Sequence, residues 1–415
     1  MNNIWEHAFL LKQQPSGKVC VEQMQSNSII ELGLNDLIFQ IFINNQAMYH
    51  IDRIFAITSD PYVLHVWNFH FHNENYAIVI STLTSFHSLF INLLKNMQDY
   101  FGNVDKNQDA TCRFNIIMSF ISSWLINENN QVSALGINGP GIYSASDIGF
   151  SSFEPSLYFN SKTDYVSLWK SVILNNRILI ISENVEDIAP AVFSVIGLSS
   201  PFEYKGKYLI TTNQYDKRIS NNRLNYSIVG VVGKNIKTAE FQKYFSNIIK
   251  VEPNSGKLND TIIVHKKMKL LYDEICVISD RNLENDPYYE LLNKRIITPD
   301  LDAIICDKMK QKTLTVPELM TLETTETFQY WLHQRIYRSN LRNSFLSVIP
   351  SETVNSLSDD DLDKAYGHII ALRKLFQNDF HFQHVLRKHK TLIARRIGMN
   401  NVHSYSSDSS LSSSL

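Results

Sequence analysis

Two glycine-containing stretches begin like phosphate-binding loops, but neither has the full set of residues that such a loop needs. Residues 139–141 read Gly-Pro-Gly, yet Ser144 stands where a dinucleotide fingerprint has its third glycine, and no buried strand is predicted before them. Residues 230–234 read Gly-Val-Val-Gly-Lys, with Asn235 in place of the Ser or Thr that binds magnesium. We expect a loop at the first stretch, a strand at the second, and no nucleotide cofactor at either.

Two histidine pairs have a spacing that places both rings on one face of an element. His70 and His72 alternate along a predicted strand, and His381 and His384 lie three residues apart in a predicted helix. A zinc ion needs further ligands to complete its shell, and neither pair has an evident cysteine or carboxylate to supply them. We expect packing or surface histidines and no metal site.

Signatures of bond-making enzymes are missing from the sequence. There is no Gly-x-Ser-x-Gly nucleophile elbow and no His-Glu-x-x-His helix. We therefore name no catalytic residues, while a metabolic α/β enzyme with a dispersed set of titratable groups stays open as an alternative.

The polar residues 183–187 follow a predicted buried strand over 177–182. Open α/β sheets bind their ligands at the carboxyl ends of their strands, so we select Glu183, Asn184 and Asp187 as candidate partner-binding residues. The alternative is structural, because Asn184 is a suitable N-cap and Asp187 lies in the first turn of the next helix.

A basic cluster lies near the C-terminus, at residues 387–390 and 395–396. Such a cluster can contact acidic lipid, or it can complement the C-terminal dipole of its own helix. Each charge adds only about 1 kcal/mol near an anionic membrane, so the sequence favours a solvated helix face.

The elements that position these residues change in type along the chain. Strand signals come first, in hairpins over residues 4–21 and 62–81, and helical periodicity follows over 85–97 and 109–125. This pattern predicts an antiparallel sheet covered by helices within residues 1–130. Residues 131–160 mix Gly, Pro, Ser and Asn without periodicity, so we expect a linker there.

Strands and helices alternate in the next part, residues 161–265. We expect strands at 177–182, 207–211, 227–232 and 260–264 and helices at 165–173, 185–197 and 238–249. The strands are almost continuously apolar, which is typical of a parallel, doubly wound sheet buried on both faces.

Helical periodicity dominates residues 266–402, through segments at 268–278, 288–292, 301–309, 316–346 and 362–397. Ser358 and the three aspartates after it mark the start of the last long helix. Residues 403–415 are Ser-rich and lack apolar bulk, so we expect them to be disordered.

Composition bounds the class of the protein. The chain has 415 residues with 44% hydrophobic side chains, enough for more than one buried core, and its net charge of -2 argues against nucleic acid as a partner. Four dispersed cysteines, no export signal at the N-terminus and no apolar stretch of about 20 residues lead us to expect a reduced, cytoplasmic location.

Four stretches together resemble the core of DENN domains. Residues 165–182 give a helix that ends in Asn-Arg before an apolar strand and a serine, and residues 191–202 give a helix followed by Pro-Phe. Residues 208–211 read Tyr-Leu-Ile-Thr, and residues 226–231 read Tyr-Ser-Ile-Val-Gly-Val, similar to the family's aromatic-x-Ile-Ile-Gly-Val strand. The resemblance spans about residues 163–233.

The resemblance implies a longin-like module before the DENN core and a helical module after it. Most DENN proteins of known activity are guanine-nucleotide exchange factors for Rab-type small GTPases and use no cofactor of their own. The resemblance thus implies a cytoplasmic exchange factor in membrane traffic, with peripheral contact to endomembranes. A scaffold that binds a GTPase or a trafficking complex without exchange activity is the alternative.

Overall fold

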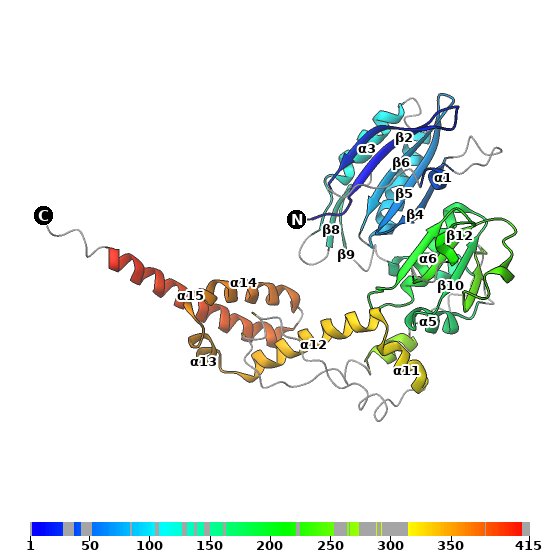
Figure 1. Cartoon of the computed structure of the whole chain (residues 1–415). Helices are drawn as coiled ribbons and strands as arrows, with labels where there is room; N and C mark the ends of the chain where they lie inside the picture. The colour runs from blue at the N-terminus through cyan, green and yellow to red at the C-terminus, as the bar shows by residue number, and fades with distance from the viewer. Residues whose placement is uncertain are drawn as a thin grey trace. The chain divides into compact units, whose positions relative to one another are not determined.

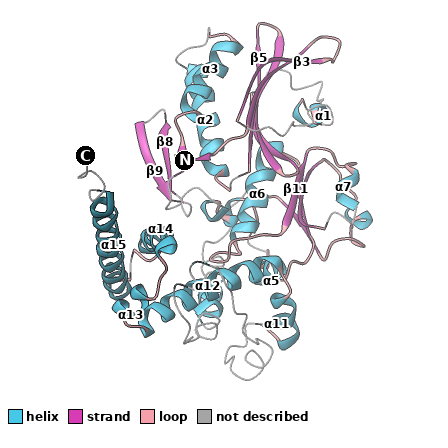
Figure 2. Ribbon diagram, turned by 60° about the vertical axis from the view of Figure 1, so that its left-hand side comes forward, coloured by secondary structure: helices cyan, strands magenta, loops and turns pink. Residues whose placement is uncertain are grey.

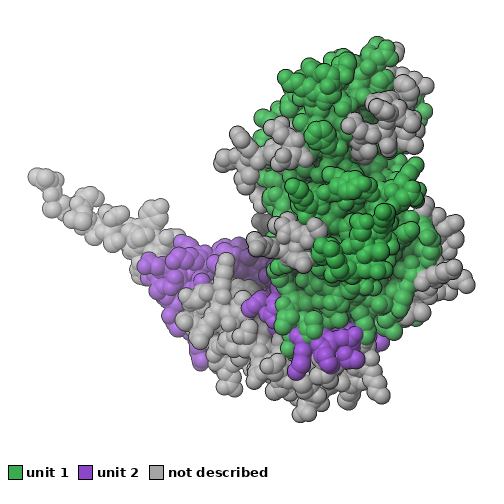
Figure 3. Space-filling view, turned by 45° about the vertical axis from the view of Figure 1, so that its right-hand side comes forward, with its two compact units in different colours: residues 1–269, 321–327 green, residues 270–320, 328–415 purple. Residues whose placement is uncertain are grey.

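The structure is a computed structural model that divides into two compact units, residues 1–269 with 321–327 and residues 270–320 with 328–415 (Figure 3). It describes residues 2–27, 37–42, 52–83, 85–103, 108–126, 131–136, 139–144, 150–160, 163–220, 225–252, 264, 266–273, 288, 292, 314–377 and 379–408. Unit 1 contains an antiparallel five-stranded sheet and a parallel four-stranded sheet, and unit 2 is helical where it is described (Figure 1). The chain is therefore α/β with a helical C-terminal part, as the sequence predicts.

The five-stranded sheet has the order β3-β2-β6-β5-β4 and is antiparallel throughout. Its strands are β2 (His7–Gln13), β3 (Val19–Ser26), β4 (Arg53–Ser59), β5 (Tyr62–Phe71) and β6 (Glu74–Thr82). Both predicted hairpins are confirmed. Strand β4 was not predicted, because five consecutive residues of it are buried and the alternation that identifies a half-exposed strand is absent.

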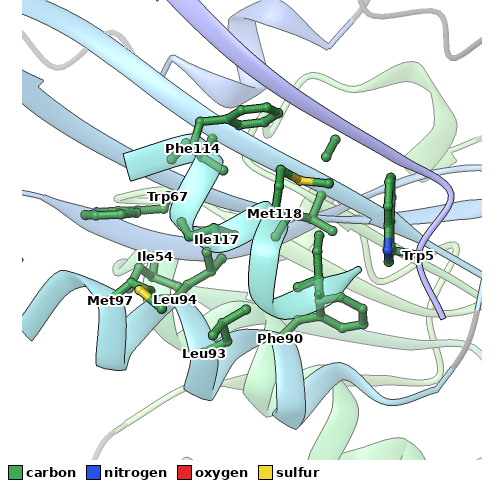
Figure 4. Close-up of a cluster of buried hydrophobic side chains, with 14 of the residues drawn as sticks. Trp5, Ile54, Trp67, Phe90, Leu93, Leu94, Met97, Phe114, Ile117 and Met118 are labelled. Carbon is green, nitrogen blue, oxygen red and sulfur yellow. The ribbon is translucent and has the colours of Figure 1, made fainter. Parts of the chain in front are cut away.

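Helices cover one face of this sheet, as the periodicity predicts. They are α2 (His87–Asn103) and α3 (Ala110–Ile121), and Asp109 caps α3 by accepting a 2.7 Å hydrogen bond from the Cys112 amide. Figure 4 shows side chains of these helices, Phe90, Leu94 and Ile117 among them, packed in one cluster with Ile54 and Trp67 of the strands. The opposite face forms a second core with Leu37, Ile41 and Phe42 in and beside the short helix α1 (Ile38–Ile41).

The expected linker over residues 131–160 contains regular structure. β8 (Gln131–Gly136) and β9 (Gly139–Ser144) form a hairpin in a small antiparallel sheet with β1 (Asn2–Asn3) and β7 (Leu125–Ile126). Residues 139–141 therefore lie in a strand and not in the predicted loop. Gly and Pro concentrate in this hairpin, which hides the strand signal. Two 3-10 turns follow, η2 (Phe150–Ser152) and η3 (Pro155–Leu157).

The parallel sheet has the order β11-β12-β10-β13. Its elements in chain order are α5 (Tyr165–Ile173), β10 (Ile178–Ser182), α6 (Val185–Gly197), β11 (Lys207–Thr211), α7 (Lys217–Ser220), β12 (Tyr226–Val232), η5 (Thr238–Glu240) and β13 (Asn247–Lys250). The predicted strand at 230–234 is confirmed as far as Val232. The helix predicted over 238–249 is wrong, because Ile248 and Ile249 pair with β10 in the ladder. Of the strand predicted at 260–264 only Val264 is described, and it is helical.

Helix α6 is buried on almost every side. It packs on β10 and β12 of its own sheet and on β4 of the antiparallel sheet, and every residue from Ile188 to Gly197 is buried. Gly230 of β12 permits this approach, because a Cβ there would lie 2.5 Å from Val192 Cγ2 and 3.0 Å from Ile188 Cγ1. On the opposite face of the sheet Ile219 and Phe245 cover Leu179 and Val229. Helix α6 is thus a shared core element of both sheets.

The C-terminal part consists of α11 (Val316–Glu323), α12 (Glu326–Ser347), α13 (Pro350–Asn355), α14 (Asp359–Leu375) and α15 (Phe380–Asp408). Each of the two long helices predicted here is divided. The break between α14 and α15 has a local cause, because Asp379 accepts a hydrogen bond from the Phe382 amide at 3.0 Å and so caps a new helix. The helices predicted at 288–292 and 301–309 lie outside the described residues, apart from Tyr288 and Leu292, which are helical.

The Ser-rich end begins inside a helix. Helix α15 continues past the expected boundary at His403 to Asp408, and residues 409–415 lie outside the described residues. Extension of a helix that is already nucleated adds one hydrogen bond per residue without a new nucleation cost, so a polar segment can continue it.

Candidate partner-binding surface

The loops that follow the parallel strands lie at one edge of their sheet. β10 ends at Ser182, β11 at Thr211 and β12 at Val232, and their ladders run in one direction. The candidate residues Glu183, Asn184 and Asp187 belong to this carboxyl edge, together with the loops after β11 and β12. We call these three loops the carboxyl-edge surface.

Asn184 and Asp187 come together as the start of α6. The Asn184 side-chain oxygen accepts from the Glu186 amide at 3.3 Å, and its Nδ2 donates to Asp187 Oδ2 at 2.9 Å. Ser182 Oγ accepts from the Asn184 amide at 3.1 Å and fixes the turn. The predicted N-cap is confirmed, so both side chains already have a structural role.

Of the three candidates, Glu183 is the one that is exposed and makes no side-chain bond to the described part of the protein that would compete with a partner. It is exposed, as Asn184 is, and its carboxylate makes no hydrogen bond or ion pair with any other described residue. Asp187 is only half-exposed and lies near Tyr158, where burial, with a smaller effect of the Asp187 carboxylate, raises the pKa of the phenol to about 12. An incoming protein would therefore meet Glu183 and Asn184 before Asp187.

Glu186 connects the two sheets. The backbone amide of Ile54, at the start of edge strand β4, donates to Glu186 Oε1 at 3.2 Å. The two residues are 132 positions apart, so no local pattern could indicate the bond. Glu186 therefore holds the start of α6 against the antiparallel sheet.

Two exposed aromatic residues lie at the carboxyl-edge surface, Tyr215 within it and Phe39 beside it, and the sequence pattern identified neither. Phe39 of α1 is 78% exposed and Tyr215 of the loop after β11 is 81% exposed. Gln40 accepts hydrogen bonds from Thr211 Oγ1 at 3.0 Å and, through its backbone oxygen, from Thr212 Oγ1 at 3.2 Å. These bonds hold α1 at the end of β11, and Figure 2 shows α1 and α7 on the same side of unit 1.

A signal for one of these aromatics exists in the sequence. Tyr215 is the single aromatic residue in the polar stretch 211–218, so its ring differs in kind from all of its neighbours in the sequence. Phe39 could not have been found, because it lies among Ile and Phe residues that read as core.

Arg218 closes one end of the surface and is not free for a partner. Its guanidinium donates to Asp216 Oδ2 at 2.7 Å and to the Thr58 backbone oxygen at 3.2 Å. Burial raises the pKa of Asp216, but the bonds from Arg218 outweigh burial and the net shift is downward. The charge pair thus fastens the loop after β11 to strand β4.

A row of polar rings crosses from one sheet to the other, and its two histidines are buried. His65 Nε2 lies 3.3 Å from His87 Nδ1, and His87 Nε2 lies 3.3 Å from the Tyr208 hydroxyl. The His87 ring stacks on Phe193 of α6, with a centroid distance of 4.2 Å. Burial lowers the pKa of His65 to about 3 and that of His87 well below its ordinary value, so both imidazoles are neutral near pH 7. Neutral rings fit a packed joint between the sheets.

Two cavities in unit 1 lie elsewhere on the parallel sheet. One of about 310 Å³ is at the opposite, amino ends of the strands and is lined by Arg177, Lys207 and Glu326 among others. Arg177 donates to the backbone oxygens of Tyr226 and Ile219 at 3.2 and 3.1 Å, which gives it a structural role. The other, about 340 Å³, lies beside β13 and the start of α5.

Neither histidine pair forms part of a metal cluster within the described residues, which contain no group of three or more potential ligands. His70 Nδ1 lies 3.0 Å from Asn75 Oδ1 within its hairpin, and His381 and His384 are exposed on α15. Cys20 and Cys112 are free thiols. No described helix combines the length and the apolar character needed to cross a bilayer.

No protein-family model and no curated protein matches the chain.

Proposed function

We propose that unit 1 is a DENN-type platform that binds a Rab-type small GTPase and promotes release of its GDP. The observation that carries the proposal is where the DENN-like stretches of sequence fall. Residues 165–182, 191–202, 208–211 and 226–231 form α5 and β10, the end of α6, β11 and β12. The four DENN-like stretches therefore form adjacent strands and helices of one sheet.

The antiparallel sheet adds independent support. For the longin-like module we expect an antiparallel sheet covered by helices, and the sheet β3-β2-β6-β5-β4 with α2 and α3 on one face and α1 on the other fits this expectation. Its edge strand β4 joins the parallel sheet within one compact unit. A partner at the joint can thus contact both modules.

Exchange needs no bond to be made or broken by the protein. It needs a surface that binds the nucleotide-free GTPase more tightly than the GDP-bound form, because the difference in affinity is what shifts the equilibrium. The carboxyl-edge surface with Phe39 and Tyr215 supplies polar groups and two large rings on a packed base, a composition typical of protein interfaces. We assign GTPase binding to it and name Glu183, Asn184 and Asp187 as its polar part.

The location follows from the proposed partner. Rab-type GTPases act on the cytoplasmic face of membranes, so we propose a cytoplasmic protein with peripheral contact to endomembranes. The scaffold alternative shares the fold and binds the GTPase without changing its nucleotide release.

An exchange assay separates the two functions. Each Rab of the source organism is loaded with a fluorescent GDP analogue, and release is followed with and without the full chain. We expect faster release from at least one Rab, and we expect Tyr215→Ala to reduce the acceleration while Lys95→Ala, an exposed change on α2, does not. Binding to a Rab without acceleration would favour the scaffold, and no binding to any Rab would overturn the proposal.

A further inference from the structure

The basic residues near the C-terminus divide into two sets with different roles. Arg396 donates to the Val354 backbone oxygen at 2.7 Å and pairs with Asp359 at 3.0 Å, and Lys390 lies over the Tyr366 ring at 5.5 Å. These two side chains hold α15 to its neighbours in unit 2. Arg387, Lys388 and Arg395 are exposed and form no ion pair with the other described residues.

The two sets lie on different faces of α15. Buried positions recur at Phe382, Leu386, His389 and Ile393, with spacings of three and four residues, and they belong to the core of unit 2. The exposed residues Phe380, His384, Lys388, Thr391 and Arg395 follow the same spacing along another face. The helix is thus amphipathic. One face is apolar and packs in the core of unit 2, and the other is basic and begins at the exposed Phe380.

A pocket opens on the basic face. It has a volume of about 400 Å³ and lies between α15 and the start of α13, lined by Pro350, Ser351, His384, Arg387, Lys388, Thr391, Leu392 and Arg395. No carboxylate is among these described lining residues. The pocket therefore combines a positive rim with apolar walls, which suits an anionic group attached to a hydrophobic body.

Two large hydrophobic side chains are exposed beside this pocket and along its helix. Ile349, next to Pro350, is 57% exposed, and Phe380, one turn before His384, is 86% exposed. Exposed hydrophobic side chains close to a row of cations are the composition of surfaces that insert into the headgroup region of a bilayer. A soluble anion would neutralise the cations but would leave both of these side chains in water.

We propose that this face of α15 with the start of α13 binds the surface of an anionic phospholipid membrane. Arg387, Lys388 and Arg395 contact lipid phosphates, with one headgroup in the pocket, and Ile349 and Phe380 enter the interface. The site gives a location to the peripheral membrane contact proposed above and rests on the proposed function in that respect. It belongs to unit 2, so vesicle binding can fail while exchange persists, and exchange can fail while vesicle binding persists.

Vesicle flotation tests the site with the full chain. Wild-type protein is expected to float with vesicles of phosphatidylcholine and phosphatidylserine and to remain behind with phosphatidylcholine alone. Each lost charge should weaken vesicle binding about fivefold, so the triple variant R387Q/K388Q/R395Q should bind anionic vesicles roughly a hundredfold more weakly than wild type. Higher salt should weaken wild-type binding in the same direction.

Matched variants separate the causes. K18Q/K95Q/K269Q removes the same charge from exposed positions of unit 1 and should bind nearly as well as wild type. I349S/F380S keeps every charge and should also lose vesicle binding, which a purely electrostatic contact would not show. Equal floating of the wild type and R387Q/K388Q/R395Q, or no floating of the wild type, would overturn the proposal. Binding of inositol hexakisphosphate with no binding to vesicles would also overturn it, in favour of a soluble anion.

Discussion

The hydroxyl of Thr58 on edge strand β4 bonds to both backbone groups of Ile210 on edge strand β11. Thr58 Oγ1 accepts from the Ile210 amide at 2.9 Å and donates to the Ile210 carbonyl oxygen at 3.3 Å, 152 positions away in the chain. A side chain thus takes the place that another strand would occupy in a ladder. Because Thr58 and Ile210 are buried, neither backbone group can use water instead.

Thr58→Val should destabilise the chain, because it keeps the shape of the side chain and leaves the buried Ile210 amide and carbonyl without their partner. The expected loss is about 1–3 kcal/mol in the free energy of unfolding, measured by urea denaturation. Thr58→Ser keeps the hydroxyl and should lose clearly less. Equal losses in the two variants would show that the methyl group, and not the hydrogen bonds, is what matters at this position.

Gly230→Ala should destabilise by about 1–3 kcal/mol, because the new methyl group overlaps Val192 and crowds Ile188 of α6. Val192→Ala makes room for the methyl group at the cost of a cavity. The double variant G230A/V192A should therefore be more stable than the sum of the two single losses predicts, a coupling that a double-mutant cycle measures. Additive losses would contradict the close approach of β12 and α6.

On the carboxyl-edge surface, Glu183→Lys and Tyr215→Ala should lower GTPase binding roughly tenfold or more and leave the melting temperature unchanged, since both side chains are exposed. Asp187→Ala should cost at most about 1 kcal/mol of stability, because it supports the start of α6. If all three variants lower the melting temperature and none changes GTPase binding, the role of this surface is structural only.

Acid should destabilise unit 1 through the buried histidines. The pKa of His65 is about 3 in the folded protein against an ordinary value of 6.5, so between these values the unfolded chain binds more protons. The stability that His65 contributes is fully present above pH 6.5 and is lost as the pH falls toward 3, by about 1.4 kcal/mol per pH unit. His65→Leu should flatten this dependence in denaturation curves at a series of pH values, and His381→Leu, on an exposed position, should not.

Deleting residues 403–415 should change neither the melting temperature nor the basal exchange rate. Among the residues of α15 whose side chains the structure describes, the last that packs against the core of unit 2 is Ile397, which precedes the deleted segment. Scanning calorimetry of the shortened and full chains checks the first part, and the exchange assay checks the second. A drop of several degrees would show that the segment contributes to the fold.

Local chemistry explains which parts of this fold the sequence could predict. The cap at Asn184, the start of α3 at Asp109 and the β5–β6 hairpin depend on neighbours in the chain, and all three were predicted at or within a residue of their position. Strand β13 has four residues, which are too few to show a period, and it pairs with β10, about seventy positions earlier in the chain. The prediction of a helix there was wrong for these two reasons.

The candidate surface was predictable only in part for the same reason. The end of β10 identified Glu183 and Asn184, since a buried apolar run followed by polar residues is a local signal. Phe39, Glu186 and Arg218 acquire their roles from strand β4 and from the joint between the sheets, both of which form through tertiary contacts. A single sequence contains no local record of such contacts.

The shared position of α6 also affects how the protein is made. During synthesis β4 leaves the ribosome about 130 residues before the helix that covers it and about 150 before β11 reaches its edge. Until then the nascent antiparallel sheet has an open edge, and its apolar core still lacks Val185 of α6. Fragments that stop between residues 130 and 210 should therefore aggregate or engage chaperones during translation, and the shortest soluble fragment should extend beyond β12.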